Sequence, residues 1–97
     1  MKRRKRRISI SDISKALGQP FDAWIREQGI NKENASRGVQ RYLDGWEVNG
    51  WWGCLAIRRL YKEFGLELRD EQDLPKPEVL ETLVLLKLEE IGGKEAA

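Results

Sequence analysis

The sequence predicts a small all-α protein, a bundle of about five helices. Two observations carry this prediction. Apolar residues recur at helical spacing in several short segments, and glycine or proline, which end helices, separate those segments. The 97 residues suffice for one helical core but leave no room for a second. We expect a disordered basic arm (1–7), a helical domain (8–68), a linker (69–77) and a C-terminal helix (78–92).

The first two predicted helices are short and lie on either side of a glycine-proline stop. In SDISKALGQP, Ser11 is the expected N-cap, Asp12 lies in the first turn, and Gly18 and Pro20 end the helix. Proline favours the first position of a helix, so Pro20 is also suited to open the second, PFDAWIREQG, whose large apolar residues share one face.

The third helix is expected in INKENASRGVQRYLDG, and the fourth, after the tryptophan segment, in CLAIRRLYKEFG with Trp52 at its start. Asn31 is the expected N-cap of the third helix, and Gly38 inside it costs about 1 kcal/mol relative to alanine. In the fourth helix, Trp52, Ala56 and Leu60 recur at a spacing of four.

The segment WEVNGWW (46–52) places three tryptophans around an Asn-Gly pair. Such a pair between large apolar residues is typical of a hairpin, whereas Asn49 could instead cap a helix that begins at Trp51. We favour a structured loop that leads into the fourth helix, with a short hairpin of 46–52 as the alternative. Trp46, Trp51 and Trp52 are expected to anchor the core or an interface, and stacking on unpaired bases is the alternative.

The last helix, EVLETLVLLKLEEI, is apolar on more than one side. A helix of this kind needs two apolar partners, its own domain and another subunit. We therefore expect it to join copies of the chain into a homodimer or a larger oligomer, with another protein as the alternative partner. The residues assigned to this role are Val79, Leu80, Leu83, Val84, Leu86, Leu88 and Ile91.

Charge is distributed unevenly along the chain, although the net charge is only +2. Residues 1–62 carry 14 Lys and Arg against 6 Asp and Glu, whereas residues 63–97 carry 4 against 10. The front of the chain therefore has a charge of +8 and the back −6. A basic front with an acidic back is typical of a protein whose front meets nucleic acid.

The composition also excludes several classes of site. A single cysteine and no histidine rule out a disulfide framework, the common zinc sites and Cys–His catalysis. No pair of carboxylates has the spacing of a metal-dependent nuclease, so we expect neither an enzyme nor a cofactor. No stretch approaches the roughly 20 apolar residues of a membrane span, and a reducing, cytoplasmic location fits best.

Residues 21–68 resemble the λ-repressor-like helix-turn-helix family. The resemblance is carried by the aromatic-Leu-Asp-Gly stretch Tyr42–Gly45, at the end of the third helix, and by Phe64-Gly65-Leu66 at the end of the fourth. It implies that INKENASRGVQRYLDG contains a recognition helix that enters the major groove of DNA and reads bases with residues 32–41. Arginine pairs with guanine there, and Asn or Gln with adenine. The readers on that helix are Lys32, Asn34, Ser36, Arg37, Gln40 and Arg41.

The DNA-binding helix pair can also be assigned to an earlier part of the chain, as a second placement. Residues 10–29 resemble the opening helix pair of winged-helix excisionases and small terminase subunits, with the Asn49-Gly50 hairpin as the wing. That helix pair would offer Arg26 and Gln28 as readers. The polar residues are denser on the third helix, and we therefore prefer the first placement. A solvated helix face without a ligand is the plain alternative to both.

The sequence thus favours an oligomeric protein that binds double-stranded DNA, a transcriptional regulator of phage or mobile-element type. The arm would follow phosphates or enter a minor groove with Lys2, Arg3, Arg4, Lys5, Arg6 and Arg7. One rival hypothesis is an adaptor or inhibitor that grips a protein partner with the tryptophan loop and the last helix. The other is a protein that binds single-stranded nucleic acid or RNA.

Overall fold

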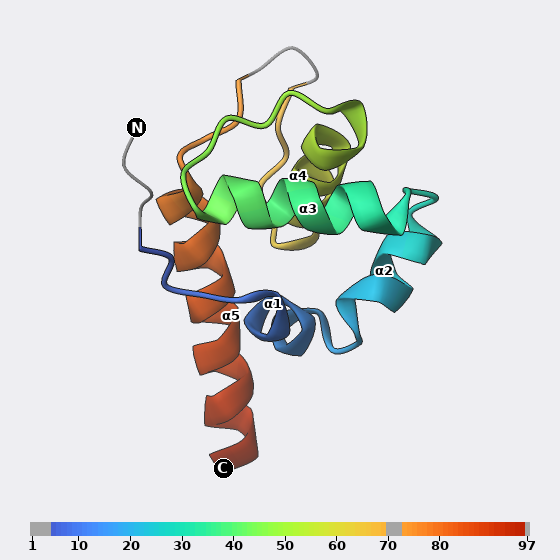
Figure 1. Ribbon diagram of the computed structural model, residues 1–97. Helices are drawn as coiled ribbons and strands as arrows, with labels where there is room; N and C mark the ends of the chain where they lie inside the picture. Colours follow the sequence, from blue (N-terminus) through green and yellow to red (C-terminus); the bar gives the residue numbers. More distant parts are fainter. Residues whose placement is uncertain (1–4, 70–72, 97) are drawn as a thin grey trace.

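The computed structural model describes residues 5–69 and 73–96 and confirms the all-α prediction (Figure 1). Within these ranges the chain forms five helices and no strand. The hairpin predicted as an alternative for 46–52 is therefore wrong, because residues 46–50 form an irregular loop and residue 51 already begins a helix. The helices are α1 (Ile10–Leu17), α2 (Phe21–Glu27), α3 (Lys32–Leu43), α4 (Trp51–Glu63) and α5 (Pro77–Ala96).

Side chains near the helix starts decide where α1 and α3 begin. The N-cap of α1 is Ser9, not the predicted Ser11, because Ser9 and Asp12 form a reciprocal capping box in which each side chain accepts a backbone N–H of the other. Asn31 caps α3 as predicted, its side chain accepting the N–H of Asn34. At the start of α4 the N-cap is Gly50, so Asn49 does not cap this helix.

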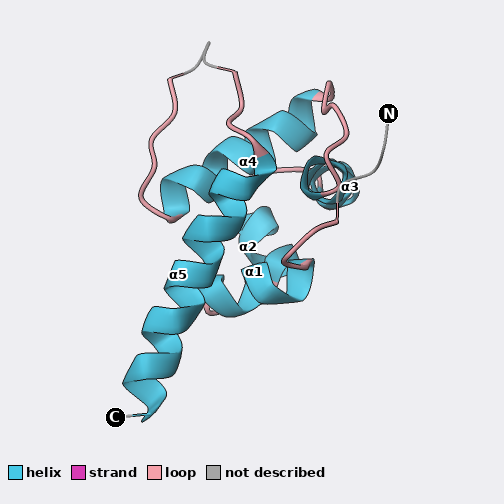
Figure 2. Cartoon of the chain, turned by 90° about the vertical axis from the view of Figure 1, so that its left-hand side faces the viewer, coloured by secondary structure: helices cyan, strands magenta, loops and turns pink. Residues whose placement is uncertain are grey.

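The closest approach between helices is the crossing of α3 and α4 (Figures 1 and 2). In Figure 1 α3 lies in the plane of the view and α4 is seen almost end-on behind it, whereas Figure 2 reverses these orientations. At the crossing, a Cβ atom on Gly38 would lie 2.4 Å from the Cα of Gly53. Gly38, which is unfavourable inside a helix, is therefore the residue that allows the backbones of α3 and α4 to touch.

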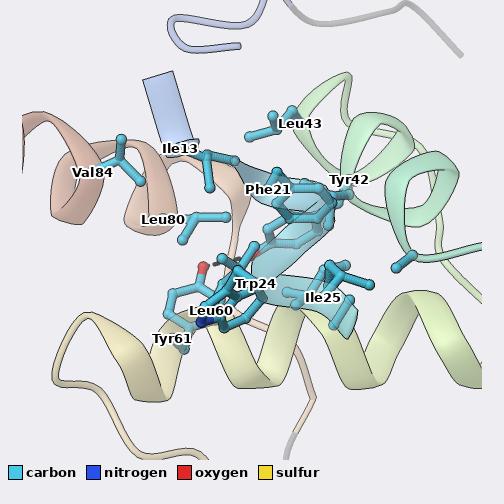
Figure 3. Packing of buried hydrophobic residues seen from close by; sticks show 14 of the residues in the cluster. Ile13, Phe21, Trp24, Ile25, Tyr42, Leu43, Leu60, Tyr61, Leu80 and Val84 are labelled. Atoms are coloured by element: carbon cyan, nitrogen blue, oxygen red, sulfur yellow. Dashed lines mark hydrogen bonds between the residues drawn. The ribbon is translucent and has the colours of Figure 1, made fainter. Parts of the chain in front are cut away.

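Every helix contributes to one core (Figure 3). The side chains of Phe21 and Ile25 meet those of the α3 and α4 inner faces, and Leu80 and Val84 of α5 lie beside Ile13 of α1 (Figure 3). The sequence predicted that Leu80 and Val84 would contact another subunit. That assignment is wrong for Leu80 and Val84, because both are fully buried in the core of their own chain.

Two tyrosines fasten α5 and the segment before it to the core. The hydroxyls of Tyr42 and Tyr61 are 2.6 Å apart, and Tyr42 donates a hydrogen bond to the backbone carbonyl of Pro75. Burial raises the pKa of the Tyr61 hydroxyl above its usual value, against the opposing effect of the hydrogen bond with Tyr42, and the nearby charge of Glu78 adds to the rise. The neutral hydroxyl pair thus holds the start of α5 against α3 and α4.

The C-terminal half of α5 extends past the other helices (Figures 1 and 2). Leu86, near the middle of the helix, is 57% exposed, and Val79 near its start is also exposed. Leu83, Leu88 and Ile91 are half-buried. Among the described residues, no helix combines the length and apolar character that a bilayer crossing requires.

Candidate nucleic-acid interface

The outer face of α3 gathers the six side chains that the sequence assigned to base reading. Lys32, Asn34, Arg37, Gln40 and Arg41 are exposed, and Ser36 is half-buried. The inner face consists of the buried Ala35, Val39, Tyr42 and Leu43. This division follows from a repeat of 3.6 residues per turn, which places polar and apolar residues on opposite sides of one helix.

Two hollows flank a ridge made by Arg37 and Arg41, which lie one turn apart on α3. The first, of about 640 Å³, lies between this ridge, the side chains of Ser36 and Gln40, and the indole of Trp46; we call it the Trp46 hollow. The second, of about 300 Å³, lies between the same ridge and the indole of Trp52; we call it the Trp52 hollow. The two arginines are thus bordered by an aromatic ring on each side.

The tryptophans of the 46–52 segment are exposed, so they do not anchor the core. Trp46 is 37% exposed, Trp51 74% and Trp52 36%, whereas Trp24 of α2 is buried. The guanidinium carbon of Arg41 lies 5.9 Å from the centre of the Trp46 ring, which is within the range of a cation–π contact. The core alternative is therefore wrong for these three rings, and an interface or a stacking surface is what their position allows.

The end of the predicted arm is fixed beside α3. The guanidinium of Arg6 donates to both carboxylate oxygens of Asp44, at 2.7 and 2.6 Å, and to the carbonyl of Gln40 at the end of α3. The hydrogen bonds with Asp44 raise the pKa of Arg6 above its usual value. Figure 1 shows the N-terminal segment passing this end of α3 before it enters α1.

The backbone of the arm is held on its other side by α5. The N–H of Arg7 donates to the buried carboxylate of Glu81 at 2.6 Å, and Ile8 is buried in the core. The prediction of a free arm over 1–7 is thus wrong for Arg6 and for the backbone of Arg7. The side chains of Lys5 and Arg7 are partly or fully open to solvent, whereas Lys2, Arg3 and Arg4 lie outside the described residues.

The electrostatics of the site depend on the two arginines of the ridge. Lys32 pairs with Asp22 of α2 at 3.1 Å, with both side chains about half exposed. In the part of the chain that the structure describes, neither Arg37 nor Arg41 has a carboxylate within ion-pair distance. Their charges are therefore available to an anionic ligand.

Three residues that were not among the predicted DNA-binding residues also shape this site. Asn49 and Gly53 line the Trp52 hollow, and Asp44 holds the arm. A glycine inside each of two consecutive helices was the available signal for the close crossing. The alternative readers Arg26 and Gln28 lie on and just after α2, where Arg26 is exposed and Gln28 half-buried.

Comparison with family models, curated proteins and solved structures found no match for this chain. Among the described residues, no group of His, Cys, Asp or Glu side chains is arranged to hold a metal ion. The site consists of a convex helix face with two guanidinium groups, amide and hydroxyl side chains beside them, indole rings at both borders, and the carboxylates of Asp22, Glu33 and Asp44 in the lining of the Trp46 hollow. The guanidinium, amide, hydroxyl and indole groups can bind anions, hydrogen-bond to base edges and stack on flat rings.

Proposed function

We propose that this protein binds double-stranded DNA, with α3 as the recognition helix, and acts as a small transcriptional regulator of phage or mobile-element type. The observation that carries the proposal is the ridge of Arg37 and Arg41, which is exposed and has no carboxylate partner among the described residues, on a helix whose other outward residues are polar. Arginine is the commonest specific reader of guanine in the major groove, and Gln40, between the two, suits adenine.

The dimensions of α3 support this docking. Twelve residues span about 18 Å, and the major groove, about 12 Å wide, admits an α-helix. The arm would add contacts to the DNA backbone, because the ion pair between Arg6 and Asp44 holds the arm beside the C-terminal end of α3. Lys5 and the cations before it would then meet phosphates next to the groove that α3 occupies.

We further propose that two copies pair through α5. Exposed Val79 and Leu86, with half-buried Leu83, Leu88 and Ile91, would bury apolar area that a monomer leaves in water. Two-fold pairing is the commonest symmetry of oligomers. It would present two α3 helices to major grooves roughly 34 Å apart, so the binding sites would be repeated or palindromic.

The test is the affinity for a labelled random-sequence duplex, measured by fluorescence anisotropy at about 50 and 200 mM salt. The double variant Arg37→Ala with Arg41→Ala should bind more weakly, with a log–log salt slope shallower by about 1–2 units. The control Lys15→Ala with Lys62→Ala removes the same charge from exposed positions on α1 and α4 and should bind as the parent does.

A second function is favoured by one observation, the 74% exposure of the Trp51 side chain. Large exposed aromatic rings are typical of the centres of protein interfaces. The chain would then be an adaptor or inhibitor that uses Trp51 and the exposed apolar residues of α5, Val79 and Leu86. If the parent protein does not bind the duplex even at low salt, this function replaces the first.

A further inference from the structure

Both hollows beside α3 are bordered by an indole, but Asp22, Glu33 and Asp44 line the Trp46 hollow, whereas no carboxylate of the described residues lines the Trp52 hollow. Gly38 and Gly53, whose backbones touch at the helix crossing, are part of its lining, together with Val48 and Gly50. Arg37, Arg41 and Trp52 are among the residues that form its walls, and the guanidinium of Arg41 lies 5.9 Å from the centre of the Trp46 ring at the border of the neighbouring hollow. A volume of about 300 Å³ is at the lower end of the range of small-ligand sites.

The chemistry of these walls selects the ligand. An apolar side chain from a protein would cover two arginines that have no carboxylate partner in the described chain, and desolvating such charges is costly. A nucleotide satisfies both walls, because its base is a flat ring that stacks on an indole and its phosphates are anions that pair with guanidinium groups. Asn34 and Asn49, which also line the hollow, can hydrogen-bond to the edge of a base.

A base within a paired duplex cannot use this recess. In the duplex both faces of a base are covered by its neighbours, and only its edges are reached from the grooves. The base that stacks on Trp52 must therefore be unpaired and turned out of the helix. The same two arginines border the major-groove face of α3, so a duplex seated on that face brings its own backbone to the mouth of the hollow.

We infer that the Trp52 hollow receives an extrahelical base, so that the preferred ligand is duplex DNA containing an unpaired nucleotide. This inference rests on the proposed binding of DNA by α3 and narrows its substrate. Trp51 provides a matched comparison, because it is the adjacent residue, is more exposed, and does not line the hollow.

The experiment compares a fully paired duplex with the same duplex carrying one unpaired 2-aminopurine, whose fluorescence falls when it stacks. The parent should bind the bulged duplex about tenfold more tightly and quench the probe. Trp52→Leu should lose the preference and the quenching, whereas Trp52→Phe, which keeps an aromatic face, and Trp51→Leu should retain both. Thermal unfolding of each variant confirms that it is folded, and the Phe variant keeps the test valid if the Leu variant is not.

The outcomes separate the two proposals. Equal affinity for both duplexes, with an unquenched probe, overturns the extrahelical-base inference and leaves binding of duplex DNA by α3 intact. No binding to either duplex at low salt overturns both. Quenching that survives in Trp52→Leu but is lost in Trp51→Leu would also overturn the assignment, since the base would then stack outside the hollow.

Discussion

Replacing Gly38 by alanine should destabilise the protein although it improves the helix. In an α-helix, alanine is more favourable than glycine by about 1 kcal/mol. Against this gain, the new Cβ would lie 2.4 Å from the Cα of Gly53, well inside the 3.4 Å at which ordinary contact begins. Neither atom belongs to a flexible side chain, so α3 and α4 must move apart by about 1 Å. Overpacking of this kind costs about 3 kcal/mol, and the net loss should be about 2 kcal/mol.

The assay is thermal unfolding followed by circular dichroism, with Gly92→Ala as the control. Gly92 is an exposed helical glycine of α5 with open space around its Cβ position, so alanine there should stabilise the protein by up to about 1 kcal/mol. For a domain of this size, a loss of 2 kcal/mol lowers the Tm by roughly 10 °C. If Gly38→Ala raises the Tm as Gly92→Ala does, the backbone contact between α3 and α4 does not exist.

Three further outcomes are expected. Arg6→Ala should lower the free energy of unfolding in urea by about 2 kcal/mol, because it removes a two-pronged hydrogen bond to the largely buried Asp44, whereas Lys5→Ala should change it little. The pKa of Tyr61 is raised in the folded state, so the stability that its hydroxyl contributes is present below about pH 10 and should fall as the pH rises beyond that value. The free energy of unfolding is measured against pH for the parent and for Tyr61→Phe, and coinciding curves would refute this expectation. Leu83→Asp with Leu86→Asp should convert the parent dimer into folded monomers in sedimentation; a parent that is already monomeric at tens of micromolar contradicts the pairing of α5.

Much of the fold could be predicted from local patterns. The number of helices and the cap of α3 at Asn31 follow from apolar spacing and from side chains a few residues apart. Ser9 was overlooked as a cap because Ser11 has the same chemistry two residues later. Ser9 caps the helix because an acidic residue, Asp12, stands three residues after it and completes the capping box, whereas Ser11 has no acidic residue at that position.

Long-range packing could not be predicted in the same way. The sequence of α5 has apolar residues on several sides, and nothing local says which of them face the chain's own core. Leu80 and Val84 proved to be buried against α1, whereas Leu86 is exposed. The pairing of Arg6 with Asp44 joins residues 38 positions apart, and a run of like charges gives no sign that one member will be held by a carboxylate.

The candidate site shows the same division. The polar face of α3 follows from helical periodicity, so the group from Lys32 to Arg41 could be named in advance. The hollows beside it depend on the path of the loop from α3 to α4 and on the contact of Gly38 with Gly53. The exposure of the tryptophans is likewise a result of that path.

The most direct test of DNA binding through α3 is an NMR titration of the backbone amide signals with a short duplex. The largest shifts should fall on the outward residues of α3, from Ser36 to Arg41, and on the adjoining loop. Amides of the outer surface of α1 and of the C-terminal half of α5 should move little. Shifts confined to α2 around Arg26, or an unchanged spectrum at low salt, would contradict the assignment of α3 as the DNA-binding helix.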